Sequence, residues 1–223
     1  MSNYCLGEIV KTKSEFIDLV SQASSKYSFV ELWLDFIEDF SFDFLEEVAN
    51  KYEDKLLVLL RRNDGKDLQI DFETRKEIIK FLGEKNIFLD LDFVVQAQEV
   101  EIYKSLDKKP PLILSFHSYK DTPGSEFLDG LILEMKKIKN VIYKIACFCN
   151  SQKDAVRLLD LYERNLDLEG NLIVIGGGPF GKLTRVAAYL WDQPIIYAPK
   201  DSAKFVIGGQ LTLEQYKKLE EIL

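Results

Sequence analysis

Short apolar segments alternate with longer amphipathic segments along the whole chain of 223 residues. Each apolar segment has about four to six residues, which suits a strand that is buried on both faces. Strands are predicted at residues 4–9, 29–34, 56–60, 87–91, 112–115, 141–146, 171–175 and 194–197. Helices are predicted at residues 13–23, 42–52, 72–83, 99–106, 125–138, 151–165, 184–191 and 212–223. At the start of the last helix, Thr212 precedes Gln215 with the spacing of a capping box.

Strands and helices that alternate in this rhythm predict an α/β protein, specifically a (β/α)8 TIM barrel in one domain over residues 1–223. An open doubly wound sheet is the alternative, because it uses the same alternation. In a barrel the chemistry lies at the carboxyl ends of the strands. Charged residues inside or directly after the apolar segments are therefore the candidates for function.

Composition and charge exclude several classes of protein. Hydrophobic residues make up 47% and charged residues 30%, as in ordinary globular proteins. The formal charge of −8 argues against a nucleic-acid interface, which needs a basic stripe. We find no apolar run of the roughly 18 residues that a membrane span needs, and no signal peptide. We therefore expect a cytoplasmic protein that binds neither nucleic acid nor membranes.

The cysteines are Cys5, Cys147 and Cys149, and the chain has a single histidine. A closed zinc site is hard to build from so few Cys and His ligands. We expect reduced thiols and no metal.

Two residues that can carry chemistry lie inside or directly after apolar segments. Lys144 interrupts the otherwise apolar segment 141–146, where burying an unpaired ammonium is costly. An amine held in such a place can attack a carbonyl to form a Schiff base, although a salt-bridged structural lysine is the alternative. His117, the only histidine, follows the predicted strand 112–115. It is a candidate for proton transfer, or a histidine that only caps a loop.

Further charged residues follow or occupy other strands. Glu31, Trp33 and Asp35 alternate, so they are predicted to share one face of the second strand. Asp90 and Asp92 repeat the pattern on the fourth strand, and Arg61 follows the third. As an alternative to a functional role, these charged residues could neutralise one another in a purely structural network. A glycine-rich loop at 176–181 follows the seventh strand and can offer amides to an anion, with Arg185 behind it able to clamp a carboxylate.

In combination these residues resemble the type I 3-dehydroquinate dehydratase family over essentially the whole chain. The resemblance rests on Glu31-x-Trp33-x-Asp35, Arg61, Asp90-x-Asp92, Ser115-Phe116-His117, Tyr119-x-x-Thr122-Pro123, Lys144-Ile145-Ala146, Thr184-Arg185 and Gly209-Gln210. The pair of His117 and Lys144, on successive predicted strands, is its most specific part.

The resemblance implies a homodimeric barrel of the shikimate pathway, without metal or redox cofactor, that converts 3-dehydroquinate to 3-dehydroshikimate. Lys144 would form an imine with the C3 ketone. His117 would remove the C2 proton and then protonate the leaving hydroxyl at C1. Glu31 and Arg61 would hold ring hydroxyls. Arg185 and Gln210 would hold the carboxylate.

Four positions depart from the family's usual pattern. Trp33 stands where the family usually has arginine, and Val206 where it has serine. Gly208 replaces the proline of the family's Pro-Gly-Gln, and an acidic residue after Arg61 is only loosely matched by Asp64. Binding residues have therefore changed while His117 and Lys144 remain. Two alternatives stay open: another Schiff-base lyase of the class I aldolase or transaldolase type, and a catalytically degenerate barrel that acts as a binding partner.

Overall fold

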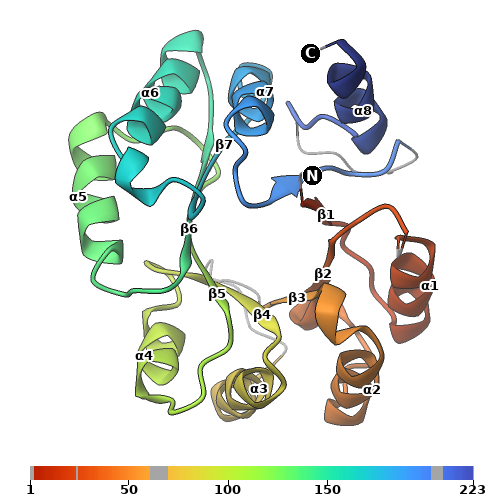
Figure 1. The fold of residues 1–223 in the computed structure, drawn as a ribbon. Helices are drawn as coiled ribbons and strands as arrows, with labels where there is room; N and C mark the ends of the chain where they lie inside the picture. Colours follow the sequence, from red (N-terminus) through yellow and green to blue (C-terminus); the bar gives the residue numbers. More distant parts are fainter. Residues whose placement is uncertain (1–2, 24, 61–69, 202–207, 223) are drawn as a thin grey trace. The chain divides into compact units, whose positions relative to one another are not determined.

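The computed structural model describes residues 3–23, 25–60, 70–201 and 208–222, and strands alternate with α-helices along them (Figure 1). The strands are β1 (Tyr4–Leu6), β2 (Phe29–Trp33), β3 (Leu56–Leu59), β4 (Phe88–Asp92), β5 (Leu112–Ser118), β6 (Ile142–Phe148), β7 (Leu172–Gly177) and β8 (Ile196–Tyr197). The helices are α1 (Lys13–Ala23), α2 (Phe42–Tyr52), α3 (Phe72–Lys85), α4 (Ala97–Ser105), α5 (Ser125–Met135), α6 (Gln152–Glu163), α7 (Lys182–Leu190) and α8 (Leu213–Ile222).

Each predicted strand and helix is present, so the predicted α/β alternation is confirmed. The bounds of α1 and α2 match the prediction, whereas β5 runs on to Ser118 through polar residues that the apolar pattern excluded. The capping box of α8 also forms. The Thr212 amide donates to Gln215 Oε1 over 3.0 Å, and the Gln215 amide donates to Thr212 Oγ1 over 3.3 Å.

The described chain forms two compact units. One consists of residues 6–113 and contains β2, β3 and β4 as neighbouring parallel strands. All four residues of β3 are buried, since β3 lies between two strands and is covered on both faces. That double coverage explains why its sequence is apolar without alternation.

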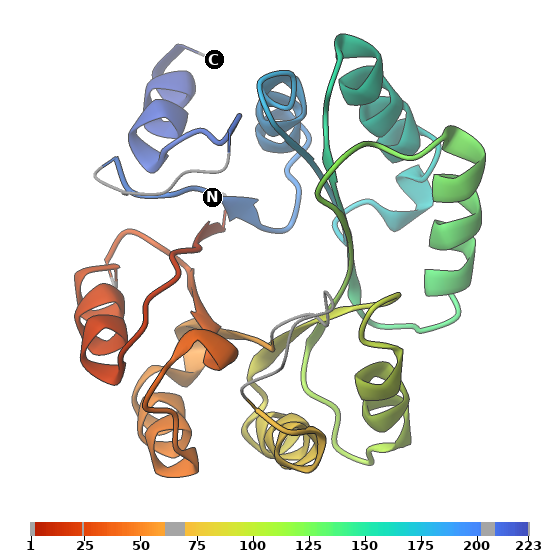
Figure 2. The same ribbon diagram turned by 180° about the vertical axis from the view of Figure 1, so that it is seen from behind.

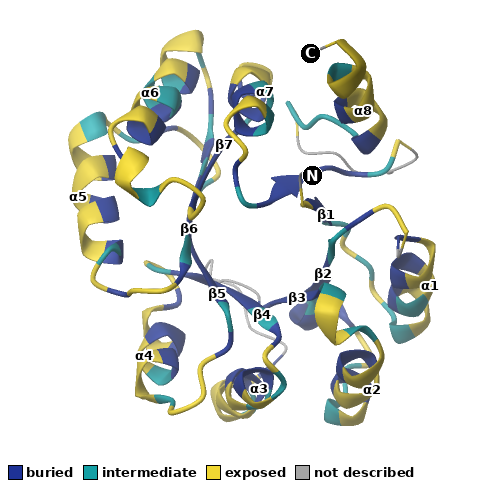
Figure 3. Cartoon of the chain, viewed as in Figure 1, coloured by how far each residue is buried: buried dark blue, intermediate teal, exposed yellow. Residues whose placement is uncertain are grey.

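The other unit consists of residues 1–5 and 114–223. In it β5, β6 and β7 are neighbours, and β1 pairs in parallel with β8. Seen from behind, α5 (green) and α6 (teal) lie side by side next to these strands (Figure 2). Buried positions follow the strands and one stripe of each helix (Figure 3). In α6 that stripe is Ala155, Leu158, Leu161 and Tyr162, the spacing of an amphipathic helix.

The outer edge of β7 is satisfied by a side chain. The Val174 amide donates to Gln193 Oε1 over 3.0 Å, and Gln193 is buried. A buried amide without an acceptor is costly, so this contact replaces a bond that another strand would supply. Along the described residues, no helix is long and apolar enough to cross a membrane.

A buried ion triad fixes the start of α3 in the unit of residues 6–113. Arg75 is fully buried, and its guanidinium donates to Asp35 Oδ2 over 2.8 Å, to Glu99 Oε1 over 3.3 Å and to the Ile70 carbonyl over 3.0 Å. Asp35 Oδ1 in turn accepts from the Ile70 amide over 3.1 Å. The triad connects the turn after β2 with α3 and α4.

We expect Arg75→Met to lower the free energy of unfolding by about 3–5 kcal/mol, because it leaves two buried carboxylates without their cation. Urea unfolding followed by circular dichroism measures the loss. Lys76→Met is the control, since Lys76 is the exposed neighbour and pairs with Glu73 at 3.8 Å on the surface of the helix; it should change stability by about 0.5 kcal/mol or less. A loss below about 1 kcal/mol for Arg75→Met would contradict the structural role of the triad.

Candidate active site

Four of the six predicted site residues lie in the unit of residues 1–5 and 114–223. Lys144 is on β6, His117 is on β5, Arg185 is on α7, and Gln210 lies in the segment before α8. Glu31 lies on β2 in the other unit. Arg61 lies outside the described residues, as do Asp64 and Val206.

Lys144 projects from the face of β6 that the helices leave open. Its neighbour Tyr143 points to the helical side, where the Tyr143 hydroxyl donates to the Ile138 carbonyl after α5 over 2.7 Å. Successive side chains of a strand point to opposite faces. On the face of Lys144, Ala146 and Phe148 are partly exposed, so a small molecule has access to that face.

His117 shares this open face. The ring of Phe116 packs against Phe127 of α5 with centroids 5.8 Å apart, which places Phe116 on the helical side and His117 on the opposite side. Because β5 and β6 are neighbours, His117 and Lys144 project from the same face of the pair. The His117 ring stacks on Tyr119 with centroids 5.8 Å apart and planes inclined by 23°.

The Lys144 side chain is buried. Lys144 is 5% exposed and lies opposite Ile173 of β7 in the parallel register. Its Nζ donates to the hydroxyl of Tyr197 on β8 over 3.2 Å and lies 4.2 Å from the centroid of that ring. Sequence reasoning missed Tyr197, because an aromatic residue at the end of a predicted strand is typical of core packing. The signal for it exists only in the fold.

The glycine-rich loop after β7 positions Arg185 instead of presenting free amides. The Gly176 amide donates to Thr184 Oγ1 over 2.7 Å, and the Gly181 amide donates to the Gly178 carbonyl over 3.1 Å. The predicted offer of amides to an anion is therefore wrong for Gly176 and Gly181, whose amides hold the loop itself. A Cβ on Gly176 would lie 2.9 Å from Thr184 Oγ1, so the turn requires glycine there.

Arg185 lies beneath this loop. It is buried, and its Nε donates to the Gly176 carbonyl over 3.2 Å. Burial lowers the pKa of the Arg185 guanidinium, and electrostatic interactions with Tyr216, Tyr197 and Cys149 oppose that shift. The Nε of Arg185 thus orients the side chain. The two terminal nitrogens of a guanidinium held in this way can bind a carboxylate through two parallel hydrogen bonds.

Gln210 is held close to the same loop. The preceding Gly209 has φ +87°, and a Cβ there would lie 2.2 Å from the Gly178 carbonyl oxygen. Only glycine permits both the left-handed backbone and this approach. The structure therefore brings the segment of Gln210 against the loop that leads to Arg185, as the prediction of a shared carboxylate site requires.

The residues of β2 differ from their predicted arrangement. Glu31 is buried and accepts a hydrogen bond from the Trp33 indole over 3.2 Å. A Cβ on Gly7 would lie 2.3 Å from Glu31 Oε2, so Gly7 leaves room for this carboxylate. The prediction that Asp35 shares their strand face is wrong, because β2 ends at Trp33 and Asp35 lies in a 3-10 turn where it pairs with Arg75.

On β4, Asp92 has a structural function. Its Oδ1 accepts from the amides of Val94 and Val95 over 3.0 and 3.1 Å, which closes the turn before α4. Asp90 is fully buried at the centre of the strand.

The cysteines are free thiols, as predicted, and all three are buried. Burial raises the pKa of Cys147 to about 12 and also raises the pKa of Cys149, so neither is a thiolate near neutral pH. Over the residues that the structure describes, no group of three or more His, Cys, Asp or Glu side chains is arranged to hold a metal.

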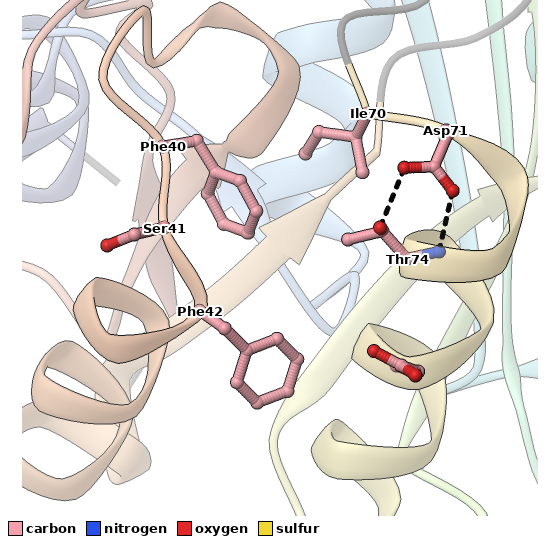
Figure 4. Close-up of a pocket in the computed structure, with 7 residues that line it drawn as sticks. Phe40, Ser41, Phe42, Ile70, Asp71 and Thr74 are labelled. Atoms are coloured by element: carbon pink, nitrogen blue, oxygen red, sulfur yellow. Dashed lines mark hydrogen bonds between the residues drawn. The ribbon is translucent and has the colours of Figure 1, made fainter.

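One surface cavity lies away from these residues. It measures about 350 Å³ and lies between the starts of α2 and α3, where Phe40 and Phe42 face Ile70 and Thr74 (Figure 4). Its polar wall is occupied by the cap of α3, since Asp71 accepts from the Thr74 amide and hydroxyl over 3.0 and 2.8 Å. None of the predicted site residues that the structure describes lines this cavity.

The fold and these side chains together define the class of the protein: a parallel α/β enzyme with a buried lysine and a histidine on one open face of neighbouring strands. A model of the type I 3-dehydroquinase family matches residues 4–223. The chain therefore belongs to the type I 3-dehydroquinase family.

Individual relatives agree with this family. The 3-dehydroquinate dehydratase of Pyrococcus abyssi is 32% identical over 213 residues, which cover 94% of this chain and 93% of the relative. That of Coxiella burnetii is 28% identical and covers 83% of this chain and 78% of the relative.

Solved structures support the fold. The type I 3-dehydroquinate dehydratase of Clostridium difficile has a TM-score of 0.82 at 18% identity, and 99% of this chain and 91% of that chain are covered. The 3-dehydroquinate dehydratase of Aquifex aeolicus has a TM-score of 0.76 at 24% identity, with coverage of 99% and 98%. The predicted (β/α)8 barrel class is confirmed, and the doubly wound alternative is set aside.

Proposed function

We propose that this chain catalyses the syn dehydration of 3-dehydroquinate to 3-dehydroshikimate with Lys144 as the Schiff-base lysine and His117 as the general base and acid. The observation that carries the assignment is that Lys144 and His117 project from one open face of neighbouring strands, away from the helices. The family makes the chain a hydro-lyase.

In the first step the Lys144 amine attacks the C3 ketone. The new C–N bond forms as the carbonyl pair moves to oxygen, and loss of that oxygen as water leaves a protonated imine. The imine nitrogen withdraws electrons from the ring and acidifies the C2 proton. Burial of Lys144 limits the access of bulk water to the amine, which favours the imine over its hydrolysis.

In the second step His117 removes the C2 proton, and the C–H pair moves toward the imine nitrogen to give an enamine. The enamine electrons then move back to form the C1–C2 double bond, and the C1–O bond breaks. The protonated His117 gives its proton to the departing hydroxyl. One residue serves in both directions because the two groups leave from one face of the ring. Water then releases the product from Lys144.

The remaining residues bind the substrate. Arg185 and Gln210 hold the carboxylate, which suits a guanidinium oriented through its Nε and a segment packed on the same loop. Glu31 and Arg61 hold ring hydroxyls, as the family resemblance implies. At β2 the Trp33 indole supplies a hydrogen bond to Glu31, so Glu31 keeps a donor where the family's arginine is missing.

The family match favours this reaction over an aldolase or transaldolase activity. The degenerate-barrel alternative predicts no turnover of 3-dehydroquinate, whereas our proposal predicts turnover. A purified sample mixed with 3-dehydroquinate, followed by ultraviolet absorbance of the conjugated enone and then treated with borohydride, separates the two. Turnover with a reduced adduct on Lys144 supports the proposal, and neither signal from a folded protein refutes it.

We expect Lys144→Ala to lose roughly 10³-fold or more in turnover, because the nucleophile is removed. His117→Ala should lose about 10²–10⁴-fold while still forming the borohydride-trapped adduct, because the histidine acts after the imine. Steady-state kinetics and intact-protein mass spectrometry measure the two effects. Lys153→Ala, an exposed lysine on α6, is the control and should behave as the wild type. Normal turnover by His117→Ala would refute the assignment of the base.

We expect Trp33→Phe to raise KM for 3-dehydroquinate roughly fivefold with a smaller change in kcat, because Glu31 loses one hydrogen bond of about 1 kcal/mol. Trp191→Phe is a matched control, since Trp191 stacks on Tyr162 with centroids 4.7 Å apart at the end of α7. Equal KM values for wild type and Trp33→Phe would mean that Trp33 does not act on the substrate through Glu31.

We also propose that the enzyme is a cytoplasmic homodimer. The three buried cysteines form no disulfide, which suits a reducing compartment, and the family resemblance implies the dimer. Light scattering after gel filtration should give about twice the chain mass of 25.8 kDa. A monomer mass at micromolar concentration would contradict the dimer.

A further inference from the structure

The side chain that contacts the Lys144 amine most directly is Tyr197. Lys144 Nζ donates to the Tyr197 hydroxyl over 3.2 Å, and the same nitrogen lies 4.2 Å from the centroid of the Tyr197 ring. Both residues are buried, at 5% and 7% exposure. Tyr197 thus contacts the end of a flexible lysine side chain in two ways, through its hydroxyl and through its ring.

Tyr197 is itself fixed by the backbone on both sides. The Ile196 amide donates to the Asn3 carbonyl over 2.9 Å, and the Ala198 amide donates to the Cys5 carbonyl over 3.0 Å. These bonds pin β8 to β1, with Cys5 opposite Tyr197 in the register. A side chain on a rigid strand positions a partner better than one on a loop.

We propose that Tyr197 is a positioning residue for the Schiff-base lysine and that it stabilises the protonated imine. The Tyr197 hydroxyl accepts a hydrogen bond from the free amine of Lys144. This bond fixes the orientation of the amine and therefore the direction of the lone pair with which it attacks the ketone. After imine formation the nitrogen still carries one N–H, so the same hydroxyl can accept it. The negative face of the ring favours the positive charge of the iminium. Tyr197 donates and takes up no proton in this role.

This inference rests on the proposed function of Lys144. It explains how a cation can form in each turnover at a buried nitrogen, since burial disfavours the charged intermediate. The hydroxyl and the ring act where charge develops, so their loss should slow the chemistry more than it weakens substrate binding.

The test compares Tyr197→Phe with Tyr143→Phe. Both changes delete one buried hydroxyl, and Tyr143 neighbours Lys144 on β6, but the Tyr143 hydroxyl points to the helical side and bonds Ile138. We expect Tyr197→Phe to lower kcat about tenfold, with KM within about twofold. It should also slow the rate at which borohydride traps the 3-dehydroquinate adduct. Tyr143→Phe should keep both kinetic values, although its urea midpoint falls.

Tyr197→Leu removes the ring as well and should lower kcat further than Tyr197→Phe. Wild-type kcat and trapping rate in Tyr197→Phe would overturn the inference, and so would equal losses in Tyr197→Phe and Tyr143→Phe. Lys144→Ala is measured alongside. If Lys144→Ala turns over normally, the proposed function fails and the inference falls with it; if Lys144→Ala is inactive while Tyr197→Phe is unchanged, only the inference is overturned.

Discussion

The site that we propose depends on the burial of one amine. Lys144 is 5% exposed beside Ile173, and a charge that is buried in this way needs a partner. One partner is Tyr197, whose hydroxyl and ring both contact the nitrogen. The neighbouring elements serve this contact: β6 carries the lysine, β8 carries the tyrosine, and the bonds from β8 to β1 keep the tyrosine in place.

The sequence predicted the order of the elements well because its signal is local. Each apolar segment contains a strand whose residues are mostly buried, and each amphipathic segment contains a helix with one buried stripe, so pattern and burial coincide. Lys144 and His117 stood out for the same reason: a polar residue in or after an apolar strand breaks the pattern. Their placement on a common face follows from neighbouring strands and the alternation of side chains.

The parts that the sequence did not predict are those that depend on tertiary contacts. Arg75 lies in an amphipathic helix and looks like an ordinary surface residue, yet the fold buries it between Asp35 and Glu99. Asp35 was predicted on the face of Glu31 by strand periodicity, which fails because β2 ends two residues earlier. The glycine-rich loop shows the same limit, since its composition suggests anion binding while its geometry turns the Gly176 and Gly181 amides inward.

At β2, Trp33 stands where the family usually has arginine, yet Glu31 still accepts a hydrogen bond from residue 33. An arginine offers several N–H donors and a charge, whereas the Trp33 indole offers one N–H and no charge. The 3.2 Å bond to Glu31 preserves the donor, and the space left by Gly7 preserves the position of the carboxylate. What is lost is the cation. The cation that we propose for the substrate carboxylate is Arg185, whose side chain donates to the Gly176 carbonyl at a turn that requires glycine.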